Sequence, residues 1–289
     1  MTNWFNKAAA VSAIAAITLV ASCKEDDERL SGSDTLDITE EAIADAYYED
    51  VDDIASVVVF NTDNPSGGRA ATNGKMATTD DRIICASISF SEGSNSEGGQ
   101  ITIDFSDNDA GYCVARGNRR EGKIILTYSG GPRTDVGFKV VLTFEDYMIN
   151  GIALAGTRTI ERVAAAEGSI KHHITLEDGQ AVWPDNKSLR READFTREWI
   201  LDSEDERVVL DGEASGITRR GREYSLVTTA PLVYRRACIL SDGIYMAVEG
   251  TKAFTTESKQ IIIDYGDGAC DRSVNITVNG TTHNVSVDN

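Results

Sequence analysis

The sequence predicts a mainly β protein, an antiparallel β meander with one N-terminal helix, and three observations support this fold class. Short runs rich in Ile, Val, Thr, Phe and Tyr recur from residue 83 onward, separated by turn residues. Asn150-Gly151 and Asn279-Gly280 each lie between two such runs, as the turn of a two-residue hairpin does. Only the segment before residue 61 has a helical apolar period. The expected architecture is an extended twisted sheet or a sandwich, built as one body or as two related units.

The first 22 residues have the pattern of a signal peptide. Met1 to Lys7 carries one positive charge, and Ala8 to Ala21 is almost entirely apolar but too short to cross a bilayer. The run Leu19-Val-Ala-Ser-Cys23 resembles the lipobox of bacterial lipoproteins, which implies cleavage before Cys23 and lipidation of its thiol. Each buried CH₂ contributes about 0.8 kcal/mol, so several acyl chains would hold the protein at a membrane. The alternative is a secretory peptide followed by a chance cysteine.

Residues 23–38 are polar and acidic without periodicity, which predicts a flexible tether. Lys24-Glu25-Asp26 resembles the surface-export signal of Bacteroidetes lipoproteins, and this implies an outer-membrane protein exposed at the cell surface. An ordinary charged tether on a periplasm-facing protein is the alternative. Asp34-Thr35-Leu36 resembles the O-glycosylation site of Bacteroidetes secreted proteins, which makes Thr35 a candidate glycosylation site.

The chain has 28 basic and 47 acidic residues, a net charge of −19. Cleavage before Cys23 would remove one basic residue, Lys7, and leave 27 basic and 47 acidic residues, or −20. Such a charge repels phosphate backbones and argues against nucleic-acid binding. The partners that remain are the membrane, reached through the N-terminal lipid, and an envelope protein or glycan.

Residues 39–80 are expected to form a helix followed by a loop. Thr39 is the candidate N-cap, and two glutamates follow it in the first turn. The apolar residues at helical spacing are Ile43, Ala44, Tyr47, Val51, Ile54 and Val58. The end of this segment, residues 56–60, has enough β-branched residues to form a strand instead.

Residues 81–289 are expected to form the β body, in which Glu177-Asp178-Gly179 is a further candidate hairpin turn. No long helical stretch separates the apolar runs, which disfavours a parallel sheet with crossover helices. Strands are expected at 83–90, 101–105, 123–128, 138–144, 148–154, 157–163, 170–176, 189–200, 208–210, 223–229, 232–238, 243–249, 260–265, 274–278 and 281–287.

The chain has five cysteines, and lipidation of Cys23 leaves four, for which three pairings exist in an oxidising compartment. An internal repeat selects among the pairings. Gln100 to Asp107 and Gln260 to Asp267 are similar, each precedes a cysteine, and each follows another cysteine in a β-like run. Two units around 83–163 and 232–289 therefore predict the disulfides Cys85–Cys113 and Cys238–Cys270.

Several phrases of the β body resemble a group of uncharacterised Bacteroidetes outer-membrane lipoproteins. These phrases are Ile101 to Phe105, Gly122 to Gly130, Thr143 to Gly151, Gly156 to Ile160, Ile263 to Asp271 and Thr277 to Gly280. The resemblance implies a β-rich envelope lipoprotein, and no activity or ligand residue comes with it. This chain departs from the group's pattern in lacking a second Thr-Phe-x-x-Tyr phrase and in the long insertion before Cys113.

Asp104, Asp107 and Asp109 are candidate metal ligands, because calcium takes several oxygen ligands from such turns. Their spacing is not that of an EF-hand, and a solvated acidic turn is the alternative. Adjacent residues point to opposite strand faces, so His172 and His173 are poor joint zinc ligands. Apart from this calcium option, we expect no cofactor.

No catalytic residue is assigned, because no nucleophile elbow or phosphate-binding loop occurs. The leading hypothesis is a lipid-anchored envelope protein with a non-enzymatic structural or interaction role. The alternatives are a binding module for an apolar ligand, a lipid or a glycan, with Trp183, Trp199 and Tyr234 as aromatic candidates, and a polysaccharide-acting hydrolase with two paired carboxyl groups.

Overall fold

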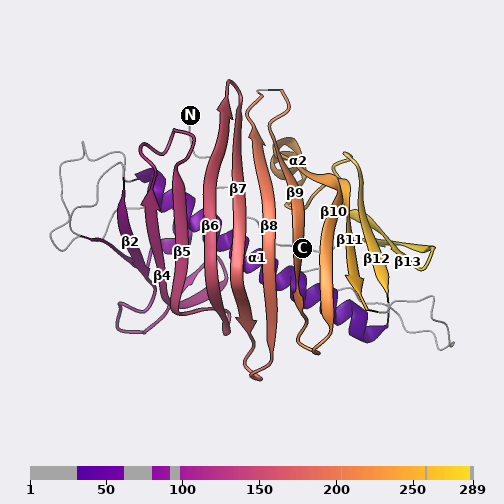
Figure 1. Ribbon diagram of the computed structural model, residues 1–289, viewed down its shortest axis with the longest axis horizontal. Coiled ribbons are helices and arrows are strands. Elements are labelled where there is room, and N and C mark those ends of the chain that lie inside the picture. Colours follow the sequence, from indigo (N-terminus) through magenta and orange to yellow (C-terminus); the bar gives the residue numbers. More distant parts are fainter. Residues whose placement is uncertain (1–30, 62–79, 92–97, 203, 258, 287–289) are drawn as a thin grey trace. The chain divides into compact units, whose positions relative to one another are not determined.

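The computed structural model describes residues 31–61, 80–91, 98–202, 204–257 and 259–286. The described chain is mainly β, as predicted, with 57% of residues in strands that form one antiparallel sheet of 14 strands. Apart from the short β3, which pairs with β4, the strands lie in chain order, as Figure 1 shows by its colours. The predicted meander is therefore confirmed.

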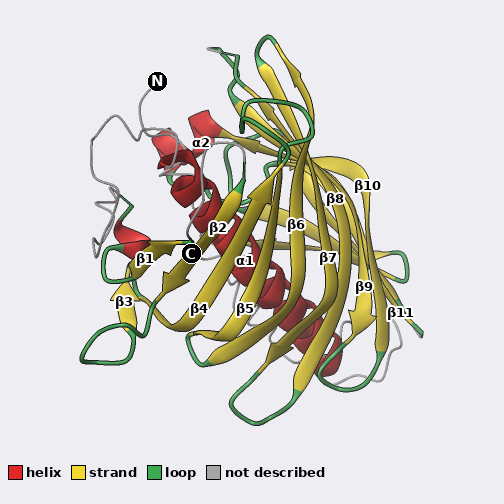
Figure 2. Ribbon diagram, turned by 60° about the vertical axis from the view of Figure 1, so that its left-hand side comes forward, coloured by secondary structure: helices red, strands yellow, loops and turns green. Residues whose placement is uncertain are grey.

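The sheet is built from strands of very different length, the longest of 15 residues. The strands are β1 Ser87–Phe90, β2 Gly99–Asp104, β3 Cys113–Ala115, β4 Asn118–Ser129, β5 Lys139–Ile149, β6 Ile152–Ala166, β7 Ser169–Val182, β8 Ser188–Ile200, β9 Arg207–Ile217, β10 Glu223–Arg235, β11 Glu249–Thr256, β12 Gln260–Asp267, β13 Ser273–Val278 and β14 Thr281–Ser286. The helices are α1 Gly32–Asn61, α2 Arg236–Asp242 and the 3-10 helix η2 Asp81–Ile83. Figure 2 colours the helices red, the strands yellow and the loops and turns green.

The described residues divide into two compact units. The first contains Tyr47–Ala165 and His172–Ser188, and the second contains residues 31–46, Ala166–Lys171 and the chain from Leu189 onward. The C-terminal half of α1 thus belongs to the first unit and its N-terminal half to the second.

The helix begins earlier than the sequence analysis predicted. α1 starts at Gly32, so residues 32–38 are helical rather than part of a flexible tether, and Thr39 lies inside the helix instead of capping it. Ser31 and Asp34 form reciprocal caps: Asp34 N–H donates to Ser31 Oγ at 3.2 Å, and Ser31 N–H donates to Asp34 Oδ2 at 3.1 Å. This pattern is a capping box with Asp in the position usually held by Glu. Residues 56–60 are helical, and the strand alternative for them is wrong.

Both asparagine-glycine turns are confirmed. Asn150 and Gly151 have φ values of 52° and 80°, and Asn279 and Gly280 have 47° and 84°. Positive φ at both central residues is the geometry of the type I′ turn, whose twist suits antiparallel strands. The turn predicted at Glu177-Asp178-Gly179 is wrong, since β7 continues through it with Asp178 at φ 53°.

Three predicted strands differ from the structure near the disulfides. The segment 83–90 is a strand only from Ser87, because Asp80 caps the 3-10 helix η2 by accepting from Arg82 N–H at 2.8 Å. The segment 232–238 ends in α2, which carries Cys238, and 243–248 is a loop that packs Ile244 and Val248 against Cys238. Gly243 ends α2 with φ 64°.

The core of the first unit contains aromatic rings in contact. Tyr147 lies 5.6 Å from Phe105 and 5.7 Å from Phe144 between ring centroids, and Tyr48 of α1 lies 6.1 Å from Phe144. In the second unit Tyr224 stacks on Phe254 at 5.3 Å. Of the predicted apolar face of α1, Ala44, Val51, Ile54 and Val58 are buried, whereas Ile43 and Tyr47 are only half-buried.

Candidate functional site

The most unusual feature of α1 is a stripe of acidic residues on its buried side. Asp34, Asp37, Glu41, Asp45 and Asp52 follow one another at spacings of three, four, four and seven residues, so they share one helix face. All of them except Asp45 are buried, and buried carboxylates require partners. Arginines of the strands and their connecting turns provide these partners in each unit.

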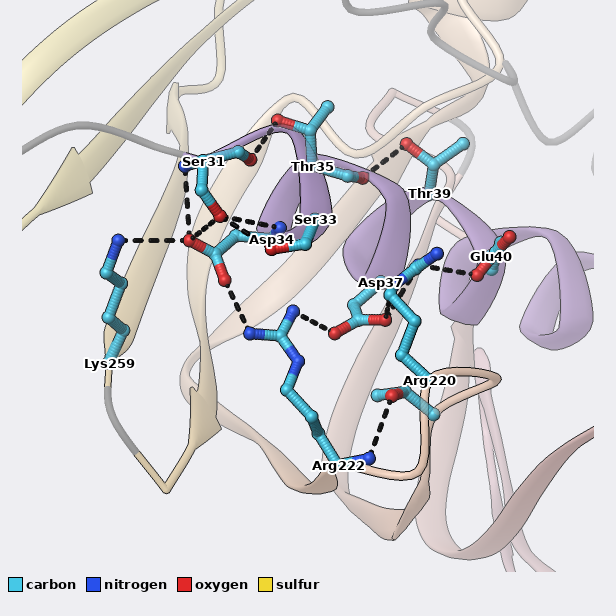
Figure 3. Close-up of polar contacts among 11 residues, drawn as sticks. Ser31, Ser33, Asp34, Thr35, Asp37, Thr39, Glu40, Arg220, Arg222 and Lys259 are labelled. Carbon is cyan, nitrogen blue, oxygen red and sulfur yellow. Dashed lines mark hydrogen bonds and ion pairs between the residues drawn. The ribbon is translucent and has the colours of Figure 1, made fainter.

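In the second unit the start of α1 contacts the β9–β10 turn and Lys259, as Figure 3 shows. We call this group the N-terminal cluster, and its members are Asp34, Asp37, Glu40, Arg219, Arg220, Arg222 and Lys259. Arg222 donates to Asp34 at 2.8 Å and also contacts Asp37. Arg220 bridges Asp37 and Glu40, with 2.7 Å to each. Three carboxylates and four cations therefore interlock at the first two turns of the helix.

Hydrogen bonds determine the charge state of this cluster. Burial by itself would raise the pKa of Asp34, but hydrogen bonds from Ser31, Arg222 and Lys259 together outweigh burial and lower its pKa to about 2. Burial would lower the pKa of Arg222, but its contacts with Asp34 and Asp37 outweigh burial and raise that pKa above its ordinary value. Asp34 and Arg222 therefore both stay charged at neutral pH.

One turn further along, Arg191 of β8 is fully buried beneath α1. Its guanidinium contacts Glu41 and donates to Asp45 at 2.7 Å. Arg191 shares its strand face with Leu189 and Ala193, which are also buried, so the period-two pattern points this arginine into the interior.

In the first unit Arg158 of β6 makes a two-point contact with Asp52. Its Nε and Nη2 donate to the two carboxylate oxygens at 2.6 and 2.7 Å, which is the paired geometry that suits a guanidinium and a carboxylate. Tyr48, fully buried, donates its hydroxyl to Ala155 O at 2.7 Å. These bonds join the C-terminal half of α1 to β6.

A second buried group in the first unit centres on Asp50. Arg120 of β4 donates to Asp50 at 2.7 Å, and Arg82 lies 3.6 Å from both Asp50 and Asp53. Arg82 also donates to Asp80 at 2.6 Å. Burial would lower the pKa of Arg82, but Asp80, Asp53 and Asp50 more than offset this effect and raise its pKa. The guanidinium therefore remains charged inside the unit.

These contacts suit attachment of the helix better than proton transfer. A general acid in glycoside hydrolysis needs a carboxyl group whose pKa is raised. Among the described carboxyl groups with a resolved shift, hydrogen bonds and neighbouring cations lower every pKa; these groups are Asp34, Asp80, Glu198 and Asp205. The structure thus presents carboxylates committed to arginines and lysines.

A shallow, open groove of about 450 Å³ lies on the first unit where β4 and β5 bulge. Its lining is polar except for Met148, and Lys123 Nζ lies 3.0 Å from Glu145 within it. Gly122 has φ 72°, and a Cβ there would lie 2.1 Å from Asp146 O. The close approach of the two strands at this point therefore requires glycine. Met148 is the one lining residue with a large apolar side chain, whereas pockets for apolar ligands are lined mostly by such side chains.

The three candidate metal ligands are only partly brought together. Asp104 and Asp107 line the groove, whereas the exposed Asp109 is outside its lining. Asp104 accepts from Ser106 N–H at 2.9 Å, and Asp264 in the second unit accepts from Gly266 N–H at the same distance. Within the described residues, no group of three or more His, Cys, Asp or Glu side chains has metal-binding geometry. Both aspartates serve the local turn.

The predicted disulfides are confirmed. Cys85 pairs with Cys113 and Cys238 with Cys270, with Cα–Cα distances of 5.5 and 5.1 Å. The first cysteine of each pair lies on a turn or short helix rather than in a strand. In both units an antiparallel pair of strands follows this cysteine and leads to the second, β1–β2 in one and β11–β12 in the other.

The remaining predicted residues have the following places. Cys23 and the export signal lie outside the described residues. Thr35 is half-buried in the first turns of α1 and donates its hydroxyl to Ser31 O at 3.2 Å. Trp199 is buried, and Trp183 and Tyr234 are half-buried.

No family model, no curated protein and no solved structure matches the chain. None of the described helices combines the length and apolar character that a membrane span requires. The assignment of a role therefore depends on the residues and contacts themselves.

Sequence reasoning missed the arginine–carboxylate contacts. The helix was predicted from its apolar period, and no partner was assigned to its acidic residues. Two signals were present: the acidic residues repeat with the helical period, and Arg191 lies on the same strand face as the apolar Leu189 and Ala193. Each signal by itself also fits a solvent-exposed face. Only the contacts between the carboxylates and the arginines distinguish a buried face from an exposed one.

Proposed function

We propose that this chain is a lipid-anchored envelope protein whose β body has a non-enzymatic structural or interaction role. The observation that carries the proposal is the pairing of α1 carboxylates with buried arginines in both units, Arg158 in the first and Arg191 in the second. Charged groups used in this way hold a helix in place. The signal-peptide pattern and Cys23 support the anchor, and the acidic residues after Cys23 support an outer-membrane, surface-exposed location.

The anchor is tested by replacing the lipidated residue. Cells expressing the wild-type chain or Cys23→Ala are labelled with a radioactive or clickable fatty acid, and the chain is immunoprecipitated. We expect the label on wild type and its complete loss in Cys23→Ala. Label retained by Cys23→Ala would refute lipidation at this position.

The location is tested separately by adding protease to intact cells. We expect the wild-type chain to be digested and a variant with Lys24-Glu25-Asp26 replaced by alanines to be protected, while both stay in the membrane fraction. Equal protection of wild type would show that the chain faces the periplasm.

The interaction role is tested by crosslinking in membranes, purification and mass spectrometry. We expect one envelope protein or glycan to be recovered reproducibly with wild type. A lipoprotein of similar size processed in parallel controls for non-specific recovery. Repeated recovery of this chain alone would contradict an interaction role.

Glycan binding is the second candidate function, and the polar groove of the first unit favours it. Its carboxylates and Lys123 can hydrogen-bond hydroxyl groups, whereas a lipid would find only Met148 as apolar lining. Binding to envelope polysaccharide should fall at least tenfold in Lys123→Ala and stay unchanged in Lys139→Ala, a similarly exposed lysine on β5. Calorimetric titration of the purified chain with calcium tests the remaining metal option.

A further inference from the structure

The last strand of the second unit, β14, has features of a self-pairing edge. Among the described strands, β14 pairs with β13 alone. Residues 273–286, which contain both strands, include no Asp, Glu, Lys or Arg, although such residues make up 26% of the chain. Proteins usually protect a sheet edge with charges, proline or a bulge. β14 has none of these, and its register with β13 is continuous.

The register shows which backbone groups face outward. Val278 and Thr281 form the closing pair of the two-residue Asn279-Gly280 turn. In an antiparallel ladder, alternate residues direct their N–H and C=O groups toward the partner strand. Counting from the closing pair, the outward groups of β14 belong to Thr282, Asn284 and Ser286. The side chains of these same three residues are exposed.

We propose that two copies of this chain pair through β14, antiparallel, about a two-fold axis at Asn284. This register places Asn284 opposite Asn284 of the second copy and Thr282 opposite Ser286 of the second copy. Each opposed pair is polar and uncharged, so it matches itself under two-fold symmetry. The same kinds of side chain already bond across β13 and β14: Thr277 and Thr282 hydroxyls lie 2.8 Å apart, and Asn284 donates to Asn275 at 3.0 Å.

Charge distinguishes a second copy from other occupants. Two chains of net charge −19 repel each other over most of their surfaces. The uncharged 273–286 hairpin is where two copies approach without opposing carboxylates. A cationic partner would instead be attracted to acidic surfaces and would gain nothing from this uncharged edge.

Cysteine crosslinking tests the register. In the proposed pairing the Cα atoms at position 284 are about 5.5 Å apart, within the range for a disulfide. We expect Asn284→Cys to give a disulfide-linked dimer on non-reducing gels from membranes of cells expressing the full chain. Ser225→Cys, exposed on the interior strand β10, is the matched control, and wild type gives the background. Thr282→Cys and Ser286→Cys should crosslink when co-expressed with each other.

Two further variants test whether the pairing exists without a crosslink. Asn284→Pro removes an outward N–H, which an edge strand tolerates, and Asn284→Lys places like charges across the axis. In mild detergent, light scattering should give twice the protein mass for wild type and the monomer mass for both variants at equal concentration. Unchanged thermal unfolding of the variants excludes misfolding as the cause. A monomeric wild type, or equal crosslinking at positions 284 and 225, would overturn the proposal.

Discussion

Removing the Arg158 guanidinium should destabilise the first unit by about 3–5 kcal/mol, the usual cost of breaking a buried ion pair. Arg158 and Asp52 have side chains 3% and 1% exposed and make two bonds of 2.6 and 2.7 Å. Arg158→Met keeps most of the side-chain volume but leaves the Asp52 carboxylate buried without its guanidinium. Two unit charges 4 Å apart at an effective dielectric constant of 20 interact by about 4 kcal/mol, which agrees with the expected loss.

A double-mutant cycle separates the ion pair from packing. Arg158→Met with Asp52→Leu removes both charges, so its free energy of unfolding should lie within about 2 kcal/mol of wild type and well above that of Arg158→Met alone. Lys139→Met is the matched control, because its ion pair with Glu161 is solvent-exposed and should contribute at most about 1 kcal/mol.

The assay is urea unfolding of the purified chain followed by circular dichroism, with hydrogen exchange of residues 47–59 as a local readout. Faster exchange in Arg158→Met would show that this half of α1 has loosened. The reasoning fails if Arg158→Met is no more destabilising than Lys139→Met. It also fails if the double variant loses the sum of the two single losses.

Three other predictions concern stability. The pKa of Asp34 is lowered to about 2 in the folded chain, so its carboxylate stabilises the fold above about pH 4 and this contribution is lost as the pH falls toward 2. Asp34→Asn should therefore be less stable than wild type at pH 7 and equally stable near pH 2. Thermal unfolding of both proteins at the two pH values measures this difference. Gly122→Ala should lower the free energy of unfolding by more than about 3 kcal/mol, because the added Cβ would clash with backbone atoms. Gly117→Ala, also at positive φ but in open space, should lower it by only about 1–2 kcal/mol. Urea unfolding measures both losses. Replacing Cys85 and Cys113 together by alanine should cost about 3–4 kcal/mol, given their separation of 28 residues, and an unchanged urea midpoint would contradict this.

The sequence predicted the strands where local chemistry determines the backbone. The two asparagine-glycine turns prescribe positive φ at both central residues, and the alternating apolar runs around them specify strands and their faces. The repeat likewise led to the correct cysteine pairs, since the two half-sequences form similar strand pairs. The prediction of element boundaries failed where a local interaction outweighed the secondary-structure propensity of the residues. Examples are the capping box at Ser31 and the short helix that carries Cys238.

The fold class, the disulfide pairs and the two asparagine-glycine turns follow from the sequence, because these depend on residues near one another in the chain or on a repeated pattern. The role of the α1 carboxylates follows only from the tertiary contacts. Asp52 meets Arg158 across 106 residues and Asp34 meets Arg222 across 188. A helical carboxylate can be buried only where a cation from a distant part of the chain contacts it, because the opposite charge must offset the cost of desolvation. Without such a cation the carboxylate stays exposed to solvent.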